Sequence, residues 1–507
     1  MRREVDITGE LNYNFFVELN GERSMARNNG HIDYDRIYVL QNRWKIARRH
    51  IVYYGIRKAP DTFKNSVPLT RGTLKKLAML DGNRSLKSVG VDATLKSLIR
   101  KGIVVPQEEY KPDKKNLEEA EFCVICTAND YMIPGLELDE NGLCPMCSMK
   151  ERLKNLKAVM PVRSRFPRNK RGEYDVALFY TGGKDSTYLL YYLCKVLGLR
   201  VLALCWETEY ISPNAAASIE NARKLVKNAD IVVKKVDKEV MRRIYARHYA
   251  LAGNTCMCPS PAYVLFYPLL TDLKVPYLVL GNEPSQMYNL IFNNISPVAA
   301  FRPWVQNIGR ALINVARLIS FRKPFKAGQM QTYFTVRTLA KGTPLYAGGE
   351  GKYHNEQVHN VFKALADEKE FMQPFKESVR RSWRNGNIPE LVHVDLAEIS
   401  GGYKWSEIKT VIKRETGWQD CADADKGLHT SCSIEKCKEY TQFTRFKEMR
   451  SRVIPFTAIE MAIAVRDGNV SREDAMREIL TSTGFFDKPP EYEEMLRPLK
   501  ENESEPD

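Results

Sequence analysis

Residues 180–187 of the chain read Tyr180-Thr181-Gly182-Gly183-Lys184-Asp185-Ser186-Thr187. This stretch follows an apolar run, Asp175–Tyr180, which is typical of a buried strand, and it leads into a helical pattern over residues 187–198. Adjacent glycines at a strand-to-helix turn let the backbone approach a phosphate group closely, and the first N–H groups of the helix attract an anion. The segment therefore predicts a phosphate-binding loop.

Side chains in this loop suit the same chemistry. Lys184 adds a full positive charge, the hydroxyls of Ser186 and Thr187 can donate hydrogen bonds, and the carboxylate of Asp185 can hold Mg²⁺. The spacing matches neither the GxxxxGK[ST] loop nor the GxGxxG dinucleotide pattern. We expect catalytic roles for Lys184 and Asp185. The expected nucleotide-binding residues of the loop are Thr181, Gly182, Gly183, Lys184, Asp185, Ser186 and Thr187.

The segments after the loop alternate between strand and helix patterns. Apolar runs at Val201–Trp206, Ile231–Lys235, Tyr277–Gly281 and Leu391–Leu396 are separated by helical stretches, one of them at 214–228. Uninterrupted apolar strands of this kind predict an α/β fold, with a Rossmann-like parallel sheet and helices on both faces. Ligands bind at the carboxyl ends of such strands, so we expect Trp206, Gly281 and Asn282 to border the nucleotide.

The loop resembles the SGGKDS loop of the PP-loop ATP pyrophosphatase superfamily, with Thr181 in place of Ser. The resemblance covers about residues 175–285. It implies that the chain binds ATP and cleaves it to AMP and pyrophosphate. It also implies that AMP is attached to a carbonyl or carboxyl oxygen of a substrate, from which a nucleophile then displaces it.

Four of the eleven cysteines form two CxxC pairs separated by 17 residues. Two such turns complete a tetrahedral four-thiolate site, which leaves no open position for water. The spacing predicts a structural zinc ion in a zinc ribbon over 120–150. Its expected ligands are Cys123, Cys126, Cys144 and Cys147.

The segment between the pairs resembles the N-terminal zinc segment of N-acetyl sugar amidotransferases. That resemblance implies ATP-dependent amidation of a sugar or sugar nucleotide, with ammonia supplied by a separate glutaminase partner. The residues that carry it are Pro134, Asp139, Asn141, Gly142, Gly281-Asn282-Glu283-Pro284, Gly417-Trp418 and Ser471–Ala475, in addition to the zinc cysteines.

Three further cysteines, Cys256, Cys258 and Cys432, favour an alternative function. Sulfur-inserting PP-loop enzymes such as tRNA thiolases carry reactive cysteines in a similar place. As catalytic residues, the three could carry a persulfide or bind a [4Fe–4S] cluster during sulfur transfer to tRNA, a peptide or a small molecule. They could equally be inert and buried, as we expect for Cys194 and Cys205. A non-catalytic nucleotide-binding adaptor is a third possibility.

Most of the net charge of +15 lies in residues 1–115, where 23 basic and 13 acidic residues give +10. Strand patterns, two helical stretches and a turn at Asp81-Gly82-Asn83 predict a winged-helix-like or docking module there. The module resembles the small peptide-binding domains of peptide-modifying enzymes. The expected domains are 1–115 for this module, 120–150 for the zinc ribbon, 170–300 for the PP-loop domain, 301–385 for a basic helical insertion, 386–497 for the rest of the catalytic domain and 498–507 for a disordered tail.

No Asp or Glu occurs in 284–349, whereas eight Lys or Arg residues lie between 302 and 341. Within this region, Val305–Phe321 is a basic amphipathic stretch. It predicts either an anion-binding surface for a sugar nucleotide or RNA, or a helix face that is solvated and covers the core. The basic residues concerned are Arg302, Arg310, Arg317, Arg322, Lys323 and Lys326.

The ends and apolar runs of the chain bear on its location. The start, MRREVD, has no apolar run after its arginines, so we expect no secretory signal. The longest charge-free run, 249–271, is interrupted by prolines, so we expect no transmembrane segment and a cytoplasmic protein.

Overall fold

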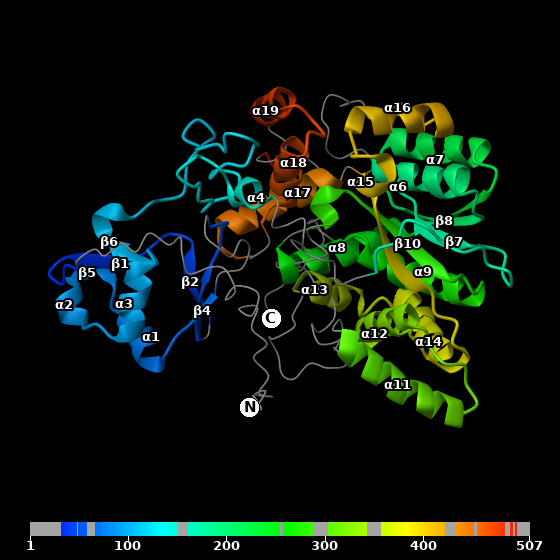
Figure 1. The fold of residues 1–507 in the computed structure, drawn as a ribbon, viewed down its shortest axis with the longest axis horizontal. Helices are drawn as coiled ribbons and strands as arrows, with labels where there is room; N and C mark the ends of the chain where they lie inside the picture. Colours follow the sequence, from blue (N-terminus) through cyan, green and yellow to red (C-terminus); the bar gives the residue numbers. More distant parts are fainter. Residues whose placement is uncertain are drawn as a thin grey trace, which may run out of the picture. The chain divides into compact units, whose positions relative to one another are not determined.

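The computed structural model describes residues 32–47, 49–57, 66–150, 161–253, 255, 257–287, 303–341, 356–420, 432, 434–450, 454–481, 487–489 and 492–493. The chain divides into two compact units, Met1–Lys150 and Glu151–Asp507 (Figure 1). Each unit has its own hydrophobic core. The tail expected at 498–507 lies outside the described residues.

The first unit contains two small antiparallel sheets and short helices around a core that includes Trp44, Leu86 and Leu98. The central strand of one sheet is β1, which pairs with β5 and β6. The other sheet has the order β2-β3-β4. The elements are β1 (Ile37–Leu40), β2 (Trp44–Ala47), β3 (His50–Tyr53), β4 (Ser66–Pro68), α1 (Arg71–Ala78), β5 (Asp81–Ser85), α2 (Leu86–Val89), α3 (Ala93–Arg100), β6 (Val104–Pro106) and α4 (Pro145–Ser148).

One local prediction for this unit is wrong. Asp81-Gly82-Asn83 was expected to be a turn, but it lies inside β5, which pairs with β1 across an irregular register. Gly82 has a φ of 84°, and its left-handed backbone fits that irregularity. Pairing with a distant strand therefore overrides the local turn preference of these residues.

The cysteine-bearing segment of the first unit packs on the β2-β3 hairpin. The Tyr53 hydroxyl donates a hydrogen bond of 2.5 Å to the carbonyl of Gly135, and Arg57 forms an ion pair of 3.1 Å with Glu137. The guanidinium of Arg43 is buried and contacts Asp113 in the connecting segment. The strand-and-helix module and the cysteine segment thus share one body.

The second unit is built on a five-stranded, fully parallel sheet with the order β11-β10-β7-β8-β9. In chain order this arrangement is 3-2-1-4-5, which is the doubly wound order of Rossmann-like folds. It confirms the predicted α/β class. The strands are β7 (Val176–Phe179), β8 (Val201–Glu207), β9 (Ala229–Lys235), β10 (Tyr277–Asn282) and β11 (Glu390–Asp395).

Helices cover both faces of this sheet (Figure 1). On one face α6, α7 and α16 pack together, and on the other α9 contacts α14, which in turn contacts α12. The helices are α6 (Lys184–Tyr191), α7 (Pro213–Leu225), α8 (Lys238–Ala252), α9 (Ser260–Asp272), α11 (Pro303–Ile319), α12 (Ala327–Lys341), α13 (Glu356–Leu365), α14 (Lys369–Asn385), α15 (Leu396–Ser400), α16 (Trp405–Thr416), α17 (Ile434–Lys447), α18 (Phe456–Arg466) and α19 (Arg472–Thr481).

The described parts of residues 301–385 form the four helices α11 to α14 and the short turns between them, and they lie in sequence between β10 and β11. Three of their helices contact other elements of the unit: α12 packs on β11, α13 on α8 and α14 on α9. Within the described part of the chain, no helix is long and apolar enough to cross a bilayer.

Candidate functional site

The switch point of the sheet lies at β7, since the chain passes from β7 to β8 on one side and later returns to β10 on the other. The loop after β7 is the predicted phosphate loop. Gly182 has a φ of 72°, and a Cβ atom there would lie 2.4 Å from the carbonyl oxygen of Ala215 in α7. Only glycine fits a backbone that is both left-handed and this close to a neighbouring helix.

Hydrogen bonds within the loop give it a closed shape. The Ser186 hydroxyl donates to the carbonyl of Gly183 at 3.2 Å, and it accepts from the N–H of Thr181 at 3.2 Å. Gly183 is the N-cap residue of α6, and it has no side chain that could satisfy the first N–H groups of the helix. The positive end of the helix dipole lies at this loop, where it would attract an anion.

Gly417 and Trp418 lie far downstream of this loop in the sequence but help to fix its backbone in the fold. Gly417 ends α16 with a φ of 68° and accepts a hydrogen bond of 2.8 Å from the side chain of Asn221. The buried indole of Trp418 then donates a bond of 3.0 Å to the carbonyl of Gly182. The motif noted in the sequence thus fixes the backbone of the phosphate loop.

Lys184 points into a buried polar cluster, and its side chain is only 7% exposed. Its ammonium group lies 2.6 Å from a carboxylate oxygen of Asp185 and 2.5 Å from the hydroxyl oxygen of Tyr403. The same ammonium lies 4.5 Å from the ring centre of Tyr403 and 5.3 Å from that of Trp405. Two aromatic rings and a carboxylate thus surround the cation.

Tyr403 was not predicted as a site residue. It follows Gly401 and Gly402, and its own φ of 58° lies in the left-handed region that a tyrosine rarely adopts. The Ser400 hydroxyl accepts a hydrogen bond of 2.9 Å from the backbone N–H of Tyr403, which helps to hold this conformation. The Tyr403 hydroxyl donates to Asp185, and burial, followed by the negative charge of Asp185, raises the pKa of this phenol. Such strain is characteristic of functional sites.

Glu283 completes the cluster from the end of β10. Burial, followed by the charges of Asp185 and Glu460, raises the pKa of Glu283 to about 8. Its carboxyl oxygen lies 2.6 Å from the hydroxyl of Ser285, which donates to it. Burial thus favours the protonated form of this carboxyl group.

The other predicted nucleotide residues lie nearby but make structural contacts. A Cβ atom on Gly281 would lie 3.1 Å from Leu396, so this glycine allows close packing next to β10. The side-chain oxygen of Asn282 accepts a hydrogen bond of 2.7 Å from His393, whose pKa burial lowers to about 4. The half-buried Trp206 is the residue before the last in β8, and its indole N–H has no hydrogen-bond partner among the described residues.

Cys258 and Cys432, two of the three cysteines of the sulfur-transfer alternative, lie close enough for the charge of one to affect the pKa of the other. Burial is the main cause that raises the pKa of the Cys432 thiol, and the charge of Cys258 is the second. A raised pKa disfavours the nucleophilic thiolate form. Cys256 lies outside the described residues. Cys194 and Cys205 are buried, and burial raises the pKa of each to about 12, which confirms that they belong to the core.

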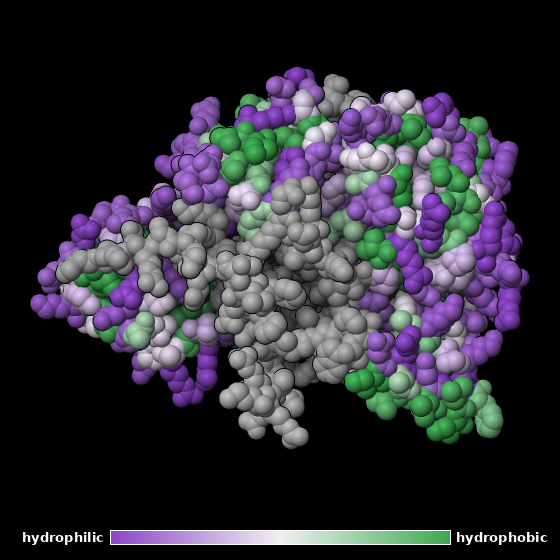
Figure 2. Space-filling view, viewed as in Figure 1, coloured by the Kyte–Doolittle hydropathy of each residue, from purple (hydrophilic) through white to green (hydrophobic). Residues whose placement is uncertain are grey.

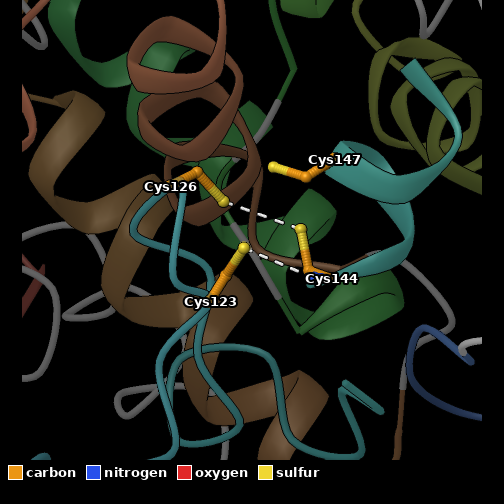
Figure 3. A group of neighbouring side chains, drawn as sticks. All are labelled: Cys123, Cys126, Cys144 and Cys147. Carbon is orange, nitrogen blue, oxygen red and sulfur yellow. Dashed lines mark hydrogen bonds between the residues drawn. The ribbon is translucent and has the colours of Figure 1, made fainter. Parts of the chain in front are cut away.

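The predicted metal centre is assembled in the first unit. All four sulfur atoms lie within 4.8 Å of one another, and the sulfurs of Cys126 and Cys144 are 3.6 Å apart (Figure 3). Tetrahedral zinc with bonds of about 2.3 Å needs sulfurs roughly 3.8 Å apart. The four side chains converge and are largely shielded from water, so the residues present fit a structural zinc ion. These ligands are Cys123, Cys126, Cys144 and Cys147.

Turns around the cysteines hold their sulfurs in place. The N–H of Cys144 donates to the sulfur of Cys123 at 3.3 Å, and the N–H of Ala128 donates to that of Cys126 at 3.4 Å. The Asp139 carboxylate accepts from the N–H groups of Asn141 and Leu143, which forms the turn before the second pair. Such bonds orient metal ligands before the ion binds.

Comparisons with known proteins identify no relative of this chain. Neither a scan against protein-family models nor a search of curated proteins finds a match to this chain.

Proposed function

We propose that this chain is an enzyme that uses ATP to adenylate a carbonyl oxygen of its substrate and releases pyrophosphate. The main support is the position of the loop Thr181–Thr187 at the switch point of a parallel sheet, where its glycines and helix N-terminus can receive phosphates. The buried ammonium of Lys184 at the same point supplies a fixed positive charge.

In this proposal each residue has a distinct role. The N–H groups at the start of α6 and the ammonium of Lys184 stabilise negative charge that develops on the phosphates. Tyr403 is a positioning residue, because it contacts both Lys184 and Asp185. The carboxylate of Asp185 provides an oxygen ligand of the kind that Mg²⁺ prefers, and the ion would screen the charge of the triphosphate.

The reaction would proceed in two displacements. The carbonyl oxygen of the substrate attacks the α-phosphorus of ATP, and the bond to the β-phosphate breaks as pyrophosphate leaves. A nucleophile then attacks the carbonyl carbon, and AMP departs with the original oxygen. With ammonia as the nucleophile and an N-acetyl sugar as the substrate, the product is an acetamidino sugar, and a glutaminase partner would supply the ammonia.

Sulfur transfer is the second candidate, because Cys258 and Cys432 are neighbours in the second unit. In that case a sulfur nucleophile replaces ammonia, and the acceptor is a tRNA, a peptide or a small molecule. The raised pKa of Cys432 weighs against an unassisted thiolate at this position. Amidation therefore remains our preferred proposal.

For the first unit we propose a zinc ribbon at 120–150 joined to a winged-helix-like docking module. The support is the four-cysteine cluster and the hydrogen-bonded contact between Tyr53 and Gly135. Zinc would then stabilise the cysteine segment, which packs against the docking module.

The test begins with the binding of Mg·ATP to the full chain by calorimetry. We expect binding to the wild type, a loss of about tenfold or more in Lys184→Ala because a charge-assisted contact is removed, and no change in Lys224→Ala, an exposed lysine on α7. Thermal unfolding identifies any variant that fails to fold, and Lys184→Arg separates charge from shape. Equal ATP affinity in the wild type and in folded Lys184→Ala would contradict the proposal.

The nucleophile is identified in a second step. The protein is incubated with [α-³²P]ATP, Mg²⁺ and a panel of UDP-N-acetyl sugars, with either ammonium chloride or sulfide. AMP formation that depends on ammonium and persists in Cys432→Ser supports amidation. Formation that depends on sulfide and is lost in Cys258→Ser and Cys432→Ser supports sulfur transfer.

A further inference from the structure

Helix α11 turns its apolar face outward. Ile308, Leu312, Val315 and Ile319 recur at intervals of three or four residues, so they share one side of the helix. Leu312 is 68% exposed and Ile319 is 74% exposed, and Phe321, just after the helix, is fully exposed. Figure 2 shows a hydrophobic patch in the region where Figure 1 places α11.

The polar face of the same helix points inward and is anchored. The side chain of Asn314 accepts a hydrogen bond of 2.8 Å from the N–H of Phe325 and donates one of 3.0 Å to its carbonyl. Arg317 is buried, donates to the carbonyls of Lys323 and Trp383, and lies 3.7 Å from the ring centre of Phe325. These bonds prevent α11 from rotating to bury its apolar side.

This anchoring corrects part of the sequence interpretation. Arg317 was considered as an anion-binding residue or as part of a solvated face, but it is buried and engaged with backbone carbonyls. Asn314 and Arg317 cover the protein together with the half-buried Ile313, whereas most other apolar side chains of α11 face solvent. The amphipathic pattern is thus oriented opposite to that of an ordinary surface helix.

Basic residues lie beside the apolar face of α11. Arg322, Lys323 and Lys326 follow the helix directly, and no acidic residue occurs between 284 and 349. Arg384 is exposed at the end of α14, and Gly386, which caps that helix, lies near the side chain of Lys323. A second copy of this chain on the face would bring basic residues against basic residues. An anionic surface complements them instead.

We propose that α11 and the turn Ser320–Lys326 form a peripheral binding surface for an anionic lipid bilayer. The apolar side chains of Leu312, Ile319 and Phe321 enter the boundary between headgroups and acyl chains, while Arg322 and Lys323 contact lipid phosphates. A helix with an exposed apolar face and an exposed aromatic residue at its end, Phe321, fits a deformable lipid surface. This inference does not depend on the ATP chemistry.

Sedimentation with lipid vesicles tests the proposal on the full chain. We expect the wild type to bind vesicles of phosphatidylcholine mixed with phosphatidylglycerol, and to bind pure phosphatidylcholine much more weakly. The double variant Leu312→Glu, Phe321→Glu removes apolar contacts at exposed positions, where folding does not depend on them, and affinity should fall by about tenfold or more. Arg322→Glu with Lys323→Glu should cause a loss of similar size.

The matched control is Leu225→Glu, which changes an exposed leucine on α7 and should bind as the wild type does. Failure of the wild type to bind anionic vesicles would overturn the proposal, as would equal binding to neutral vesicles. A dimer in light scattering that dissociates in Leu312→Glu, without lipid binding, would also overturn it and would assign the face to a second copy of the chain.

Discussion

The ammonium nitrogen of Lys184 lies 2.5 Å from the phenolic oxygen of Tyr403, a residue 219 positions later in the chain. The same hydroxyl donates to Asp185, which itself contacts Lys184. One tyrosine therefore completes a triangle of hydrogen bonds with the two charged residues of the phosphate loop. A buried ion pair is costly unless its remaining hydrogen-bonding groups are satisfied, and Tyr403 satisfies both partners.

Replacing Tyr403 by phenylalanine keeps the ring and removes the hydroxyl. Hydrogen bonds to charged groups contribute about 1.5–3 kcal/mol, so the free energy of unfolding should fall by roughly that amount. Mg·ATP affinity should fall by about tenfold, because Lys184 is no longer held in place. Urea unfolding and calorimetry measure the two effects. Tyr191→Phe, on the same helix as Lys184, serves as the control, and an effect of equal size there would show that the hydroxyl of Tyr403 has no special role.

Glu283 predicts a dependence of stability on pH. Its pKa is raised from 4.5 to about 8 in the folded chain, so the folded state binds more protons than the unfolded state between these values. The stabilising contribution is complete below pH 4.5 and is lost as the pH rises through 8. Glu283→Gln mimics the protonated form at every pH. The unfolding free energy of this variant, compared with that of the wild type, should therefore increase as the pH rises through this window.

Urea unfolding at pH 5 and at pH 8 measures that difference. The control is Glu220→Gln, since Glu220 is largely exposed on α7. A constant difference between Glu283→Gln and the wild type at both pH values would show that Glu283 titrates normally.

Gly182→Ala should have two effects, backbone strain and a steric clash, and a comparison with Gly468→Ala separates them. Any non-glycine residue at its φ of 72° is strained by about 1–2 kcal/mol, and the added Cβ would also lie 2.4 Å from Ala215. Gly468 has a similar φ of 75° but no atom within 4 Å of such a Cβ, so Gly468→Ala isolates the first effect. We expect Gly182→Ala to lower the melting temperature further than Gly468→Ala does and to weaken Mg·ATP binding. Equal melting temperatures would rule out the steric effect.

Metal analysis tests the cysteine cluster. We expect one zinc ion per chain, and we expect Cys144→Ser to lose it, since all four sulfurs converge on one point. Structural zinc contributes apparent binding free energies of about 10–16 kcal/mol, so its loss should unfold the ribbon. Mass spectrometry for zinc and limited proteolysis measure the two effects. Cys437→Ser, a buried cysteine in α17, should retain the metal; zinc bound to Cys144→Ser would place the ion elsewhere.

The parts of the site that were predictable are local in sequence. Two glycines and a lysine after an apolar strand identify the loop Thr181–Thr187, and two CxxC pairs identify the metal cluster, because each motif carries its own geometry. The five strands follow from apolar runs of the right length. Their order in the sheet does not, because nothing in β10 alone indicates that it pairs with β7.

The partners of the loop could not be found in this way. Tyr403 and Trp405 reach Lys184 only after the chain has folded, and neither belongs to a motif. Gly401 and Gly402, just before Tyr403, are the sole local hint of an unusual backbone. The outward apolar face of α11 was likewise hidden, because periodicity shows that a helix has two faces but not which of them the protein covers.

The contact between Trp418 and Gly182 also has a consequence for synthesis of the chain. The two residues are 236 positions apart, and a ribosome that adds about 5–20 residues per second needs roughly 12–47 s to make the residues between them. During that interval the nascent chain already contains the phosphate loop but lacks the indole that fixes its backbone. A growing or truncated polypeptide that ends before Trp418 therefore carries the loop sequence without the contact that fixes its shape.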